Sequence, residues 1–450
     1  MKKITFKHAV KVTIVSLGTL VLAACGSGSA ENPSTSPNAS AGGASGGYET
    51  ATPPKEVKLK IGLPGGYDVT NKAIVDGFIA KFPHIKTEIQ EAPWGDFTTK
   101  ITTEIAGGTA PDIWFQENAV ILGYGKRGVA EDLSAYIDRD LNESEYIDGL
   151  FTAKTPEGQV YGIPHGINPV ALAYNKKIFT DANVPFPTDD WTYTDLIETA
   201  RKLTKDTNGD GQTDQYGFSA SQGITQGWYP WVRSHGGHAL DDTLKKAMFA
   251  EPKSVEGITA WANLVKEGVS PTDDYLKVAG GDWKVFGNGE AAMFFMQYSL
   301  QVLLKNNFEA LDYDTVMMPK GTDGNRIVPM VTNSWLIFSK AKQESKEAAW
   351  EFLKYYLSEE AQNILSASGA SIPVHKNAMT KLDETANPKN KKAFSDGIAQ
   401  SGVTTDESAS WQEWRTAAQP VFAEIYTQKV SLEEGMKQIQ QKVQDVLDQN

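Results

Sequence analysis

The 450-residue chain has a single cysteine, Cys25, which leaves no second thiol for an internal disulfide or for a thiol metal site. No second long apolar run follows the first 24 residues, so the body of the chain does not predict a membrane-spanning helix. The zinc-protease motif His-Glu-x-x-His is absent. The hydrolase motif Gly-x-Ser-x-Gly occurs at residues 43–47, where neither a strand nor a helix is expected beside it. These features argue against two large classes of hydrolase.

The chain is also short of basic residues relative to acidic ones. Removing the four lysines of residues 1–24 from the 43 basic residues leaves 39 against 56 acidic ones, a net charge of −17. Such an acidic body argues against nucleic acid or an anionic lipid surface as a partner. About 395 residues follow residue 55, which is too many for one compact core and predicts two lobes.

The first 24 residues have the pattern of a secretory signal peptide, with four lysines, an apolar stretch and small residues before a cleavage point. The run Leu22-Ala-Ala-Cys25-Gly26 resembles the lipobox of bacterial lipoproteins. That resemblance implies cleavage before Cys25 and a lipid on its sulfur, which would anchor the protein to the extracytoplasmic face of the cell membrane. The alternative is an ordinary signal peptide with an incidental cysteine. Residues 25–55, rich in Gly, Ser, Ala and Pro, predict a flexible tether.

The body begins with the pattern of an α/β protein. Residues 57–63 alternate apolar and other side chains as a strand does, residues 71–82 have apolar residues at helical spacing, and residues 84–90 predict a second strand. A strand–helix–strand order favours a parallel pair of strands. Further on, the apolar run 170–174 predicts a buried strand, and residues 411–446 are mostly helical. We therefore expect an α/β fold.

Six short motifs follow one another along this body. They occupy residues 107–112, 161–164 with 174–179, 206–217, 287–293, 346–353 and 431–436. With these motifs in this order, the chain resembles the extracellular solute-binding proteins of ABC-type sugar importers, the maltose-binding-protein-like group. The resemblance implies two α/β lobes with a ligand cleft between them. It also implies a multi-crossing hinge, with crossings near residues 163–169, 318–326 and 371–376.

In this reading one lobe holds residues 57–166 and 320–370, and the other holds residues 170–317 and 376–450. The first crossing, 163–168, is expected to be flexible through Gly166. The resemblance implies that the lobes close on a sugar or oligosaccharide and that the closed form delivers it to the transmembrane subunits of an ABC permease. It further implies a monomeric binding protein rather than an enzyme, with no cofactor required.

A sugar presents hydroxyl groups and apolar C–H faces, so its site needs carboxylates, amides and aromatic planes. The family places polar ligands after the strand predicted at 111–115, and often one more in the first crossing. The resemblance therefore implies that Gln116, Glu117, Asn118 and Asn168 are candidates, and it matches Trp335 to a cleft position.

Other candidates are selected by their place at the ends of predicted strands and helices, where open α/β sheets bind ligands. They are Trp94, Trp228, Trp231, Gln297, Tyr298, Trp414 and Arg415. Of the two tryptophans around Pro230, one is expected to face the cleft and the other the core. Core packing is the alternative for every tryptophan among the candidates. The alternative is a solvated loop for residues 116–118, a turn residue for Asn168, and an ordinary strand end for Gln297 and Tyr298. His165 is expected to act in the crossing rather than on the ligand.

The loop at 206–214 raises a separate question, because it matches the first nine positions of a calcium-binding EF-hand loop. The oxygen-bearing side chains are those of Asp206, Asn208, Asp210, Gln212 and Asp214. The position of the usual bidentate glutamate holds Gly217. The loop is therefore either a structural calcium site that needs a carboxylate from elsewhere, or a turn whose side chains satisfy its own backbone.

Two other classes of function remain open. The first is a binding protein for a polyamine, a peptide or a glycerol phosphate ester; the second is a surface-anchored glycosidase. A glycosidase needs two carboxylates about 5–10 Å apart, and no motif in this sequence singles out such a pair. Tryptophans outnumber arginines at the candidate positions, which favours a sugar over a phosphate ester.

Overall fold

The computed structural model describes residues 55–64, 69–147, 151, 153–155, 157–379, 382 and 386–449, without the side chains of Val69, Trp94 and Gly95. The chain divides into two units, Met1–Pro53 and Pro54–Asn450, and all described residues belong to the second. The predicted signal peptide, Cys25 and the tether as far as residue 54 lie outside the described residues. Among the described helices, none combines the length and the apolar character that crossing a bilayer requires.

The first strands form a parallel arrangement at one end of a mixed sheet. The chain runs through β1 (Val57–Pro64), α1 (Val69–Lys81), β2 (Ile85–Ala92), α2 (Trp94–Gly107), β3 (Ile113–Glu117) and α3 (Asn118–Lys126). β1 pairs in parallel with both β2 and β3. The predicted strand–helix–strand opening is thereby confirmed. β7 (Val328–Ile337) then lies antiparallel beside β3, so that Glu117 is opposite Asn333.

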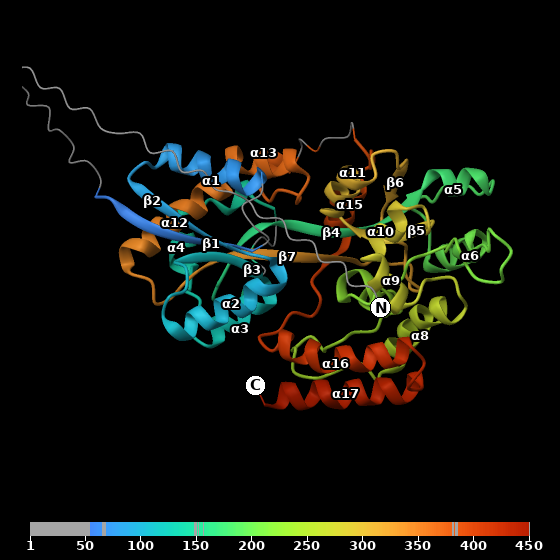
Figure 1. Cartoon of the computed structure of the whole chain (residues 1–450). Coiled ribbons are helices and arrows are strands. Elements are labelled where there is room, and N and C mark those ends of the chain that lie inside the picture. The colour runs from blue at the N-terminus through green and yellow to red at the C-terminus, as the bar shows by residue number, and fades with distance from the viewer. Residues whose placement is uncertain are drawn as a thin grey trace, which may run out of the picture. The chain divides into compact units, whose positions relative to one another are not determined.

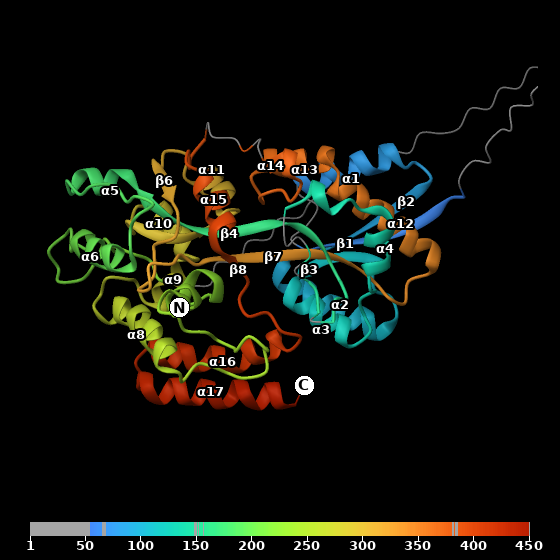
Figure 2. The same ribbon diagram turned by 180° about the vertical axis from the view of Figure 1, so that it is seen from behind.

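Two long strands, β4 and β7, connect the halves of the sheet. β4 runs from Ile163 to Asn175 without interruption, so the predicted crossing and the predicted strand after it form one element. Its first half pairs with β7, and its second half pairs with β5 (Met293–Gln297) and β6 (Tyr313–Val316). Proline is tolerated in a sheet at irregular positions, and the register shifts between Pro164 and Gly166. Figures 1 and 2 show β4 and β7 side by side between two groups of helices.

Most of the remaining elements are helices around this sheet, and the short strand β8 (Gly402–Val403) pairs in parallel with β7. The α-helices are α4 (Ser134–Asp140), α5 (Lys176–Asp181), α6 (Tyr193–Leu203), α7 (Tyr229–Ser234), α8 (Pro252–Lys266), α9 (Asp273–Ala279), α10 (Asp282–Gly287), α11 (Leu300–Asn307), α12 (Gln343–Leu357), α13 (Glu359–Ser368), α14 (Lys376–Met379), α15 (Lys392–Ser401), α16 (Trp411–Tyr426) and α17 (Leu432–Asp448). The predicted α/β class is confirmed.

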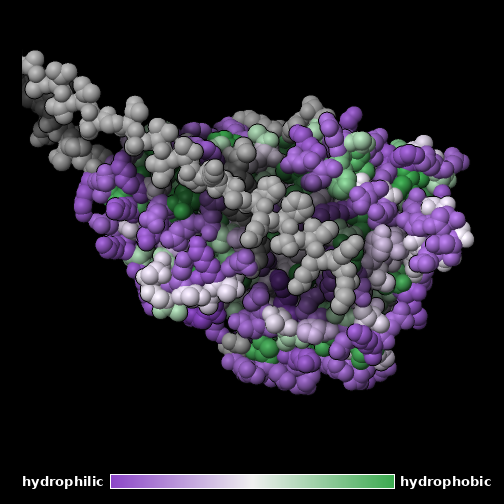
Figure 3. Space-filling model, viewed as in Figure 1, coloured by the Kyte–Doolittle hydropathy of each residue, from purple (hydrophilic) through white to green (hydrophobic). Residues whose placement is uncertain are grey.

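The hydrophobic residues gather in two main cores. One core contains residues between 59 and 167 and between 335 and 374. The other contains residues between 170 and 318 and between 411 and 443, with Ala119 of α3 and Val328 joining it. We call the parts built on these two cores lobe 1 and lobe 2. On the face drawn in Figure 3 the described surface is mostly hydrophilic, with hydrophobic residues in small scattered patches.

Gly166 lies in β4 where the strand meets residues that follow α13. A Cβ atom on Gly166 would lie 2.6 Å from the Cβ of Ser371 and 3.1 Å from a methyl group of Leu365. The sequence suggested that this glycine supplies flexibility. The structure adds a second requirement, because any side chain here would collide with its neighbours.

Gly166→Ala is therefore expected to lower the free energy of unfolding by about 1–3 kcal/mol, the usual cost of adding a methyl group to a packed interior. The matched control is Gly107→Ala, because the nearest atom to its added Cβ is Oγ1 of Thr109 at 3.7 Å. That control is expected to keep or slightly raise the free energy of unfolding, since alanine favours helices. Urea denaturation measures both variants, and wild-type stability for Gly166→Ala would contradict the packing argument.

Candidate functional site

The end of β3 brings three of the predicted ligand residues to the boundary between the lobes. Gln116 and Asn118 are buried, and both are held within lobe 1. The amide of Gln116 donates a hydrogen bond to Thr98 Oγ1 at 2.8 Å, and the amide of Asn118 donates one to Thr332 Oγ1 at 2.7 Å. The side chain of Glu117 keeps 30% of its surface exposed, which makes it the residue of the three that reaches out of lobe 1.

The start of α16 in lobe 2 faces Glu117. The guanidinium of Arg415 lies 3.8 Å from the Glu117 carboxylate, so this ion pair joins the two lobes. Arg415 also lies over the indole ring of Trp411, 4.5 Å from its centroid. Residues four apart share one face of a helix, so Arg415 covers the ring of Trp411, which is only 4% exposed. We call Glu117, Trp411 and Arg415 the inner cluster.

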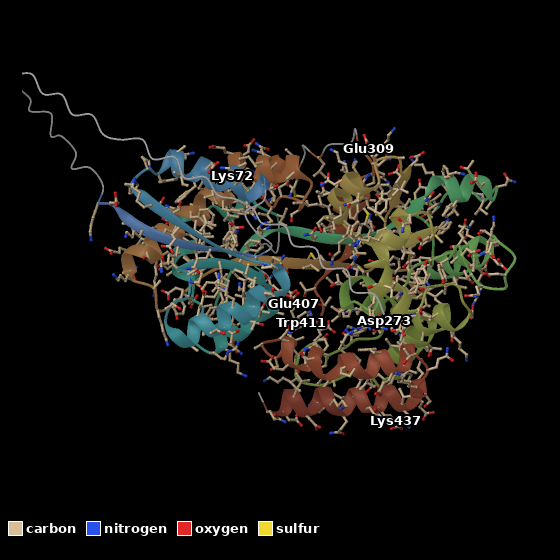
Figure 4. All side chains as sticks on the ribbon, in the orientation of Figure 1. Lys72, Asp273, Glu309, Glu407, Trp411 and Lys437 are labelled. Carbon is tan, nitrogen blue, oxygen red and sulfur yellow. The ribbon has the colours of Figure 1, made fainter. Side chains whose placement is uncertain are left out.

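Glu407 is a second carboxyl group near the inner cluster, and no motif in the sequence selects it. Its side chain is partly exposed, but its Oε2 atom is buried and has no hydrogen-bond partner within the described residues. Burial raises the pKa of Glu407 to about 8, and the negative charge of Glu117 contributes to this rise. Burial also raises the pKa of Glu117, while Arg415 acts in the opposite direction. Figure 4 shows Glu407 and Trp411 close together near the start of α16.

Two further polar atoms nearby are buried without a partner among the described residues. They are Oδ1 of Asn333, opposite Glu117 in the sheet, and Oγ of Ser408. A buried polar atom that makes no hydrogen bond costs about 1–3 kcal/mol. Both atoms are closed to solvent in this conformation, so a ligand hydroxyl group would reach them only after neighbouring side chains move.

A cavity of about 440 Å³ lies beside Glu407 and has walls from both lobes. Leu122 and Tyr161 line it from lobe 1, and Leu244, Glu407, Ser408 and Leu447 line it from lobe 2. Its volume falls in the range of about 300–1,000 Å³ that is usual for small-molecule sites.

A larger hollow of about 530 Å³ lies beside Arg233 and Arg326. The guanidinium of Arg233 pairs with Asp406 at 3.4 Å, and that of Arg326 donates to Gln400 Oε1 and to backbone carbonyl groups. The residues that line this hollow lie between 233 and 401 and include none of the lobe 1 core, so we place the candidate site at the inner cluster and the cavity, to which both lobes contribute.

The predicted tryptophans other than Trp94 lie in the cores. Trp228 is 2% exposed and stacks on Phe422 at 4.6 Å, and Trp231 is fully buried against Tyr193 at 4.8 Å. Neither faces a cleft, although the sequence led us to expect that one would. Trp335 is 1% exposed and packs on Phe115 at 4.9 Å.

The last predicted tryptophan, Trp414, is also fully buried, and its neighbour Trp411 lies under Arg415 instead. In this conformation the four described tryptophans among the candidates offer almost no surface to a ligand. The side chain of Trp94 lies outside the described residues.

The other predicted residues make contacts near the crossing. Asn168 donates to Ser371 Oγ at 3.3 Å and accepts from the backbone of Ser299 at 2.9 Å, so it ties three chain segments together. Gln297 lies opposite Val170 at the end of β5, and Tyr298 is buried against Phe394 at 5.3 Å.

His165, which the sequence assigned to the crossing, packs 4.7 Å from the ring of Phe115. Burial lowers the pKa of His165 to about 4. The residue is therefore neutral at physiological pH.

The 206–214 loop folds so that its side chains accept hydrogen bonds from its own backbone. Asp206 accepts from Gly209 and Gly211, at 2.6 and 2.7 Å, and Asp214 accepts from Thr207 at 2.8 Å. Among the residues that the structure describes, no cluster of three histidine, cysteine or acidic side chains suits a metal ion. Calcium at Asp206, Asn208, Asp210, Gln212 and Asp214 stays a prediction.

Comparison with known proteins identifies the class. The model of the family described as bacterial extracellular solute-binding protein matches residues 73–395. The chain belongs to this family, whose two-lobed fold it shares.

Curated relatives are distant but cover most of the chain. An erythritol/L-threitol-binding protein of Mycolicibacterium smegmatis is 25% identical over 379 residues, which are 76% of this chain and 74% of that protein. A binding protein of Brucella abortus is 23% identical over 318 residues, which are 70% of this chain and 75% of that protein.

Solved structures share the fold. An ABC substrate-binding protein of Listeria monocytogenes in complex with cycloalternan has a TM-score of 0.79 at 22% identity, over 88% of this chain and 100% of that chain. The maltose-bound MalE3 of T. maritima has a TM-score of 0.73 at 20% identity, over 86% of this chain and 99% of that chain.

The buried carboxyl of Glu407 makes stability depend on pH. The unfolded chain releases this proton near pH 4.5 and the folded protein holds it to about pH 8, so the folded state binds more protons between these values. The free energy of unfolding should therefore fall as the pH rises through this window. Glu407→Gln removes the effect and should be more stable than the wild type at pH 8.5 by about 1–3 kcal/mol, and equally stable at pH 4.5.

Thermal unfolding across pH 4.5–8.5 measures this difference. Glu413→Gln serves as the control, because it removes a carboxylate that is 47% exposed, six residues further along the chain in the first turn of α16. We expect its pH profile to follow that of the wild type. Parallel profiles for Glu407→Gln and the wild type would show that Glu407 is not held protonated.

Proposed function

We propose that the protein is the substrate-binding component of an ABC importer, which captures a sugar or an oligosaccharide outside the membrane and delivers it to the permease by closing its lobes. The observation that carries this proposal is that the inner cluster and the adjoining cavity are both built from residues of the two lobes. A ligand bound there touches both lobes at once. It therefore binds the closed arrangement better than an open one, which is how a ligand drives closure.

The residues fit the chemistry of a sugar. Arg415, stacked on the buried ring of Trp411, offers a planar cation, and the partly exposed carboxylate of Glu117 offers oxygen acceptors for hydroxyl groups. Relatives that bind a tetritol, maltose and cycloalternan support polyhydroxylated ligands as the substrate class. Binding of this kind requires neither a nucleophile nor a cofactor, so we propose capture without catalysis.

The residues of the candidate site also bear on the alternative functions, which are a glycosidase and a binding protein for a polyamine or a phosphate ester. Glu117 and Glu407 are two interacting carboxylates on opposite sides of the cleft, as a glycosidase requires, and they also resemble a site for a polyamine. A relative that binds sn-glycerol 3-phosphate keeps a phosphate ester open. The nearby guanidinium of Arg415 opposes a polyamine, and the carboxylate of Glu117 opposes a phosphate ester.

The family is extracellular, and we propose that this member is held at the membrane by a lipid on Cys25. The tether after Cys25 would let the binding body, which acts as a monomer, reach the transmembrane subunits of its permease. A lipid anchor of this kind works by burying acyl chains in the bilayer.

Intrinsic tryptophan fluorescence and calorimetry with a panel of mono- to tetrasaccharides and tetritols test the proposed substrate class. At least one saccharide is expected to bind, and Arg415→Ala should weaken that binding about tenfold or more because it removes the charge and the surface over Trp411. Arg201→Ala is the matched control. It removes an exposed arginine that pairs with Glu267 at 2.8 Å outside the site, and it should bind as the wild type does.

The same panel includes spermidine, a tripeptide and sn-glycerol 3-phosphate. A response to one of these compounds and to no saccharide would reject the sugar proposal. Release of smaller sugars during incubation would favour a glycosidase.

The anchor is tested by the variant Cys25→Ala in the full chain. The wild type is expected in the membrane fraction with incorporated radiolabelled fatty acid, and the variant should incorporate none. The control Ser27→Ala, two residues further along, should behave as the wild type does. Equal labelling of the wild type and Cys25→Ala would disprove the lipid anchor.

A further inference from the structure

A hollow of about 440 Å³ on lobe 1 gathers four lysines. Lys58 and Lys60 stand two residues apart on β1, so their side chains leave the same face of the strand. Lys340 and Lys342 lie on the segment between β7 and α12. Within the part of the chain that the structure describes, none of these four lysines forms an ion pair with a carboxylate.

The carboxylates of the same hollow are fewer, and two of the three are engaged. Glu344 pairs with Lys55 at 2.9 Å. Asp112 accepts a hydrogen bond from the backbone N–H of Lys60 at 2.9 Å, and burial raises its pKa. Glu56 is the third, and it is exposed. With Lys55, five lysines stand against three carboxylates, so this surface is positive on a chain whose net charge is −13.

We call the five lysines the lysine patch; they are Lys55, Lys58, Lys60, Lys340 and Lys342. The adjacent strand β2 leaves the balance unchanged, because it places Lys86 opposite Lys58 and Glu88 opposite Lys60. All residues of the patch belong to lobe 1. The patch is therefore a local excess of positive charge on one end of an acidic body.

The lysine patch surrounds the point at which the body follows the predicted tether. Lys55 is the first residue that the structure describes, and its partner Glu344 lies in the first turn of α12. Figure 1 shows the start of β1 and the start of α12 at the same end of lobe 1. Residues 26–54 separate this point from Cys25, and a Gly- and Ser-rich chain of that length has a root-mean-square reach of roughly 30 Å. A lipid on Cys25 would therefore keep the patch close to a bilayer, at an effective concentration in the millimolar range.

The acidic charge of the whole body does not prevent contact between this patch and an anionic bilayer. At physiological ionic strength charges are screened beyond about 8 Å, so an anionic surface interacts chiefly with the face that touches it. Lysines at the surface of a bilayer are attracted by anionic headgroups. Because a tethered body is already near the bilayer, a weak attraction is enough to orient it.

We propose that the lysine patch contacts the anionic lipid headgroups of the membrane that carries the anchor. This contact holds lobe 1 against the bilayer. The inference rests on the proposed lipid anchor at Cys25, and it goes further because it gives the tethered body a preferred orientation. Since no residue of the patch belongs to lobe 2, lobe 2 stays free to move during closure.

Amine acylation of the full lipidated chain on vesicles, followed by mass spectrometry, tests the contact for each lysine. The vesicles consist either of phosphatidylcholine alone or of phosphatidylcholine and phosphatidylglycerol in equal parts. On the anionic vesicles Lys58, Lys340 and Lys342 should react at least about threefold more slowly than on the neutral ones, because headgroups cover them. At about 1 M salt, where charges are screened beyond about 3 Å, the rates on the two kinds of vesicle should become equal.

Lys429 and Lys442 are exposed lysines on lobe 2 and serve as internal controls. Their acylation rates should not depend on the lipid. The double variant Lys340→Gln, Lys342→Gln should reduce the protection of Lys58 at least about twofold, because it removes two charges that attract the headgroups. The matched double variant Lys429→Gln, Lys442→Gln should leave that protection unchanged.

Equal acylation rates on neutral and anionic vesicles, with the chain still bound to both, would overturn the proposal and leave the lipid anchor intact. Equal slowing of the patch lysines and the control lysines would also overturn it, because the adsorption would then not be specific to the patch. A chain that does not stay with the neutral vesicles would reject the lipid anchor, and the proposed contact with it.

Discussion

The pairing of β4 with β7 is the constraint on which the rest of the structure depends. β4 is paired along its first half with β7 in lobe 1 and along its second half with β5 and β6 in lobe 2. β7 in turn pairs with β3, so that the parallel strands of lobe 1 are fixed to the same pair. The positions of Glu117 at the end of β3 and of Asn333 on β7 follow directly from this register. The backbone hydrogen bonds of the sheet thus determine where the site between the lobes lies.

Two ion pairs, Glu117–Arg415 and Arg127–Glu413, cross the contact between the lobes beside Ala119, which packs into the core of lobe 2. Arg415 compensates Glu117 across the boundary, whereas Glu407 has no cation of its own within the described residues and keeps its proton instead. Burying a carboxylate is costly unless it is paired, so the arrangement favours a partner that supplies hydrogen-bond donors. A polyhydroxylated ligand does so without bringing a charge. The charged groups at the boundary between the lobes therefore favour the proposed class of neutral, polyhydroxylated ligands.

Much of the fold could be predicted from the sequence, and less of the site. The alternation at residues 57–63 and the helical spacing at 71–82 each reflect local packing, and both appear as β1 and α1. The region 411–446 was predicted to be mostly helical with a cap at Ser431, and the structure confirms a second helix that begins there, after Gln428 takes a positive φ of 59°. The burial of the tryptophans could not be predicted, because the residues that pack on them are remote in sequence. Trp228, for example, stacks on Phe422. Glu407 stands in a loop without a motif, and only the folded structure reveals its burial. By contrast, Trp411 and Arg415 are four residues apart in a predicted helix, so their contact on one helical face could have been predicted from the sequence.

The geometry of β4 and β7 also has a mechanical meaning. In an antiparallel pair the hydrogen bonds run across the strands, so a force directed along the strands loads several of them at once, while a bend or twist loads few. The pair of strands therefore resists sliding of one strand along the other, and it yields more easily to bending. A transmembrane partner that pulls on one lobe would separate the lobes by rotation, at low force, long before it displaced one lobe past the other.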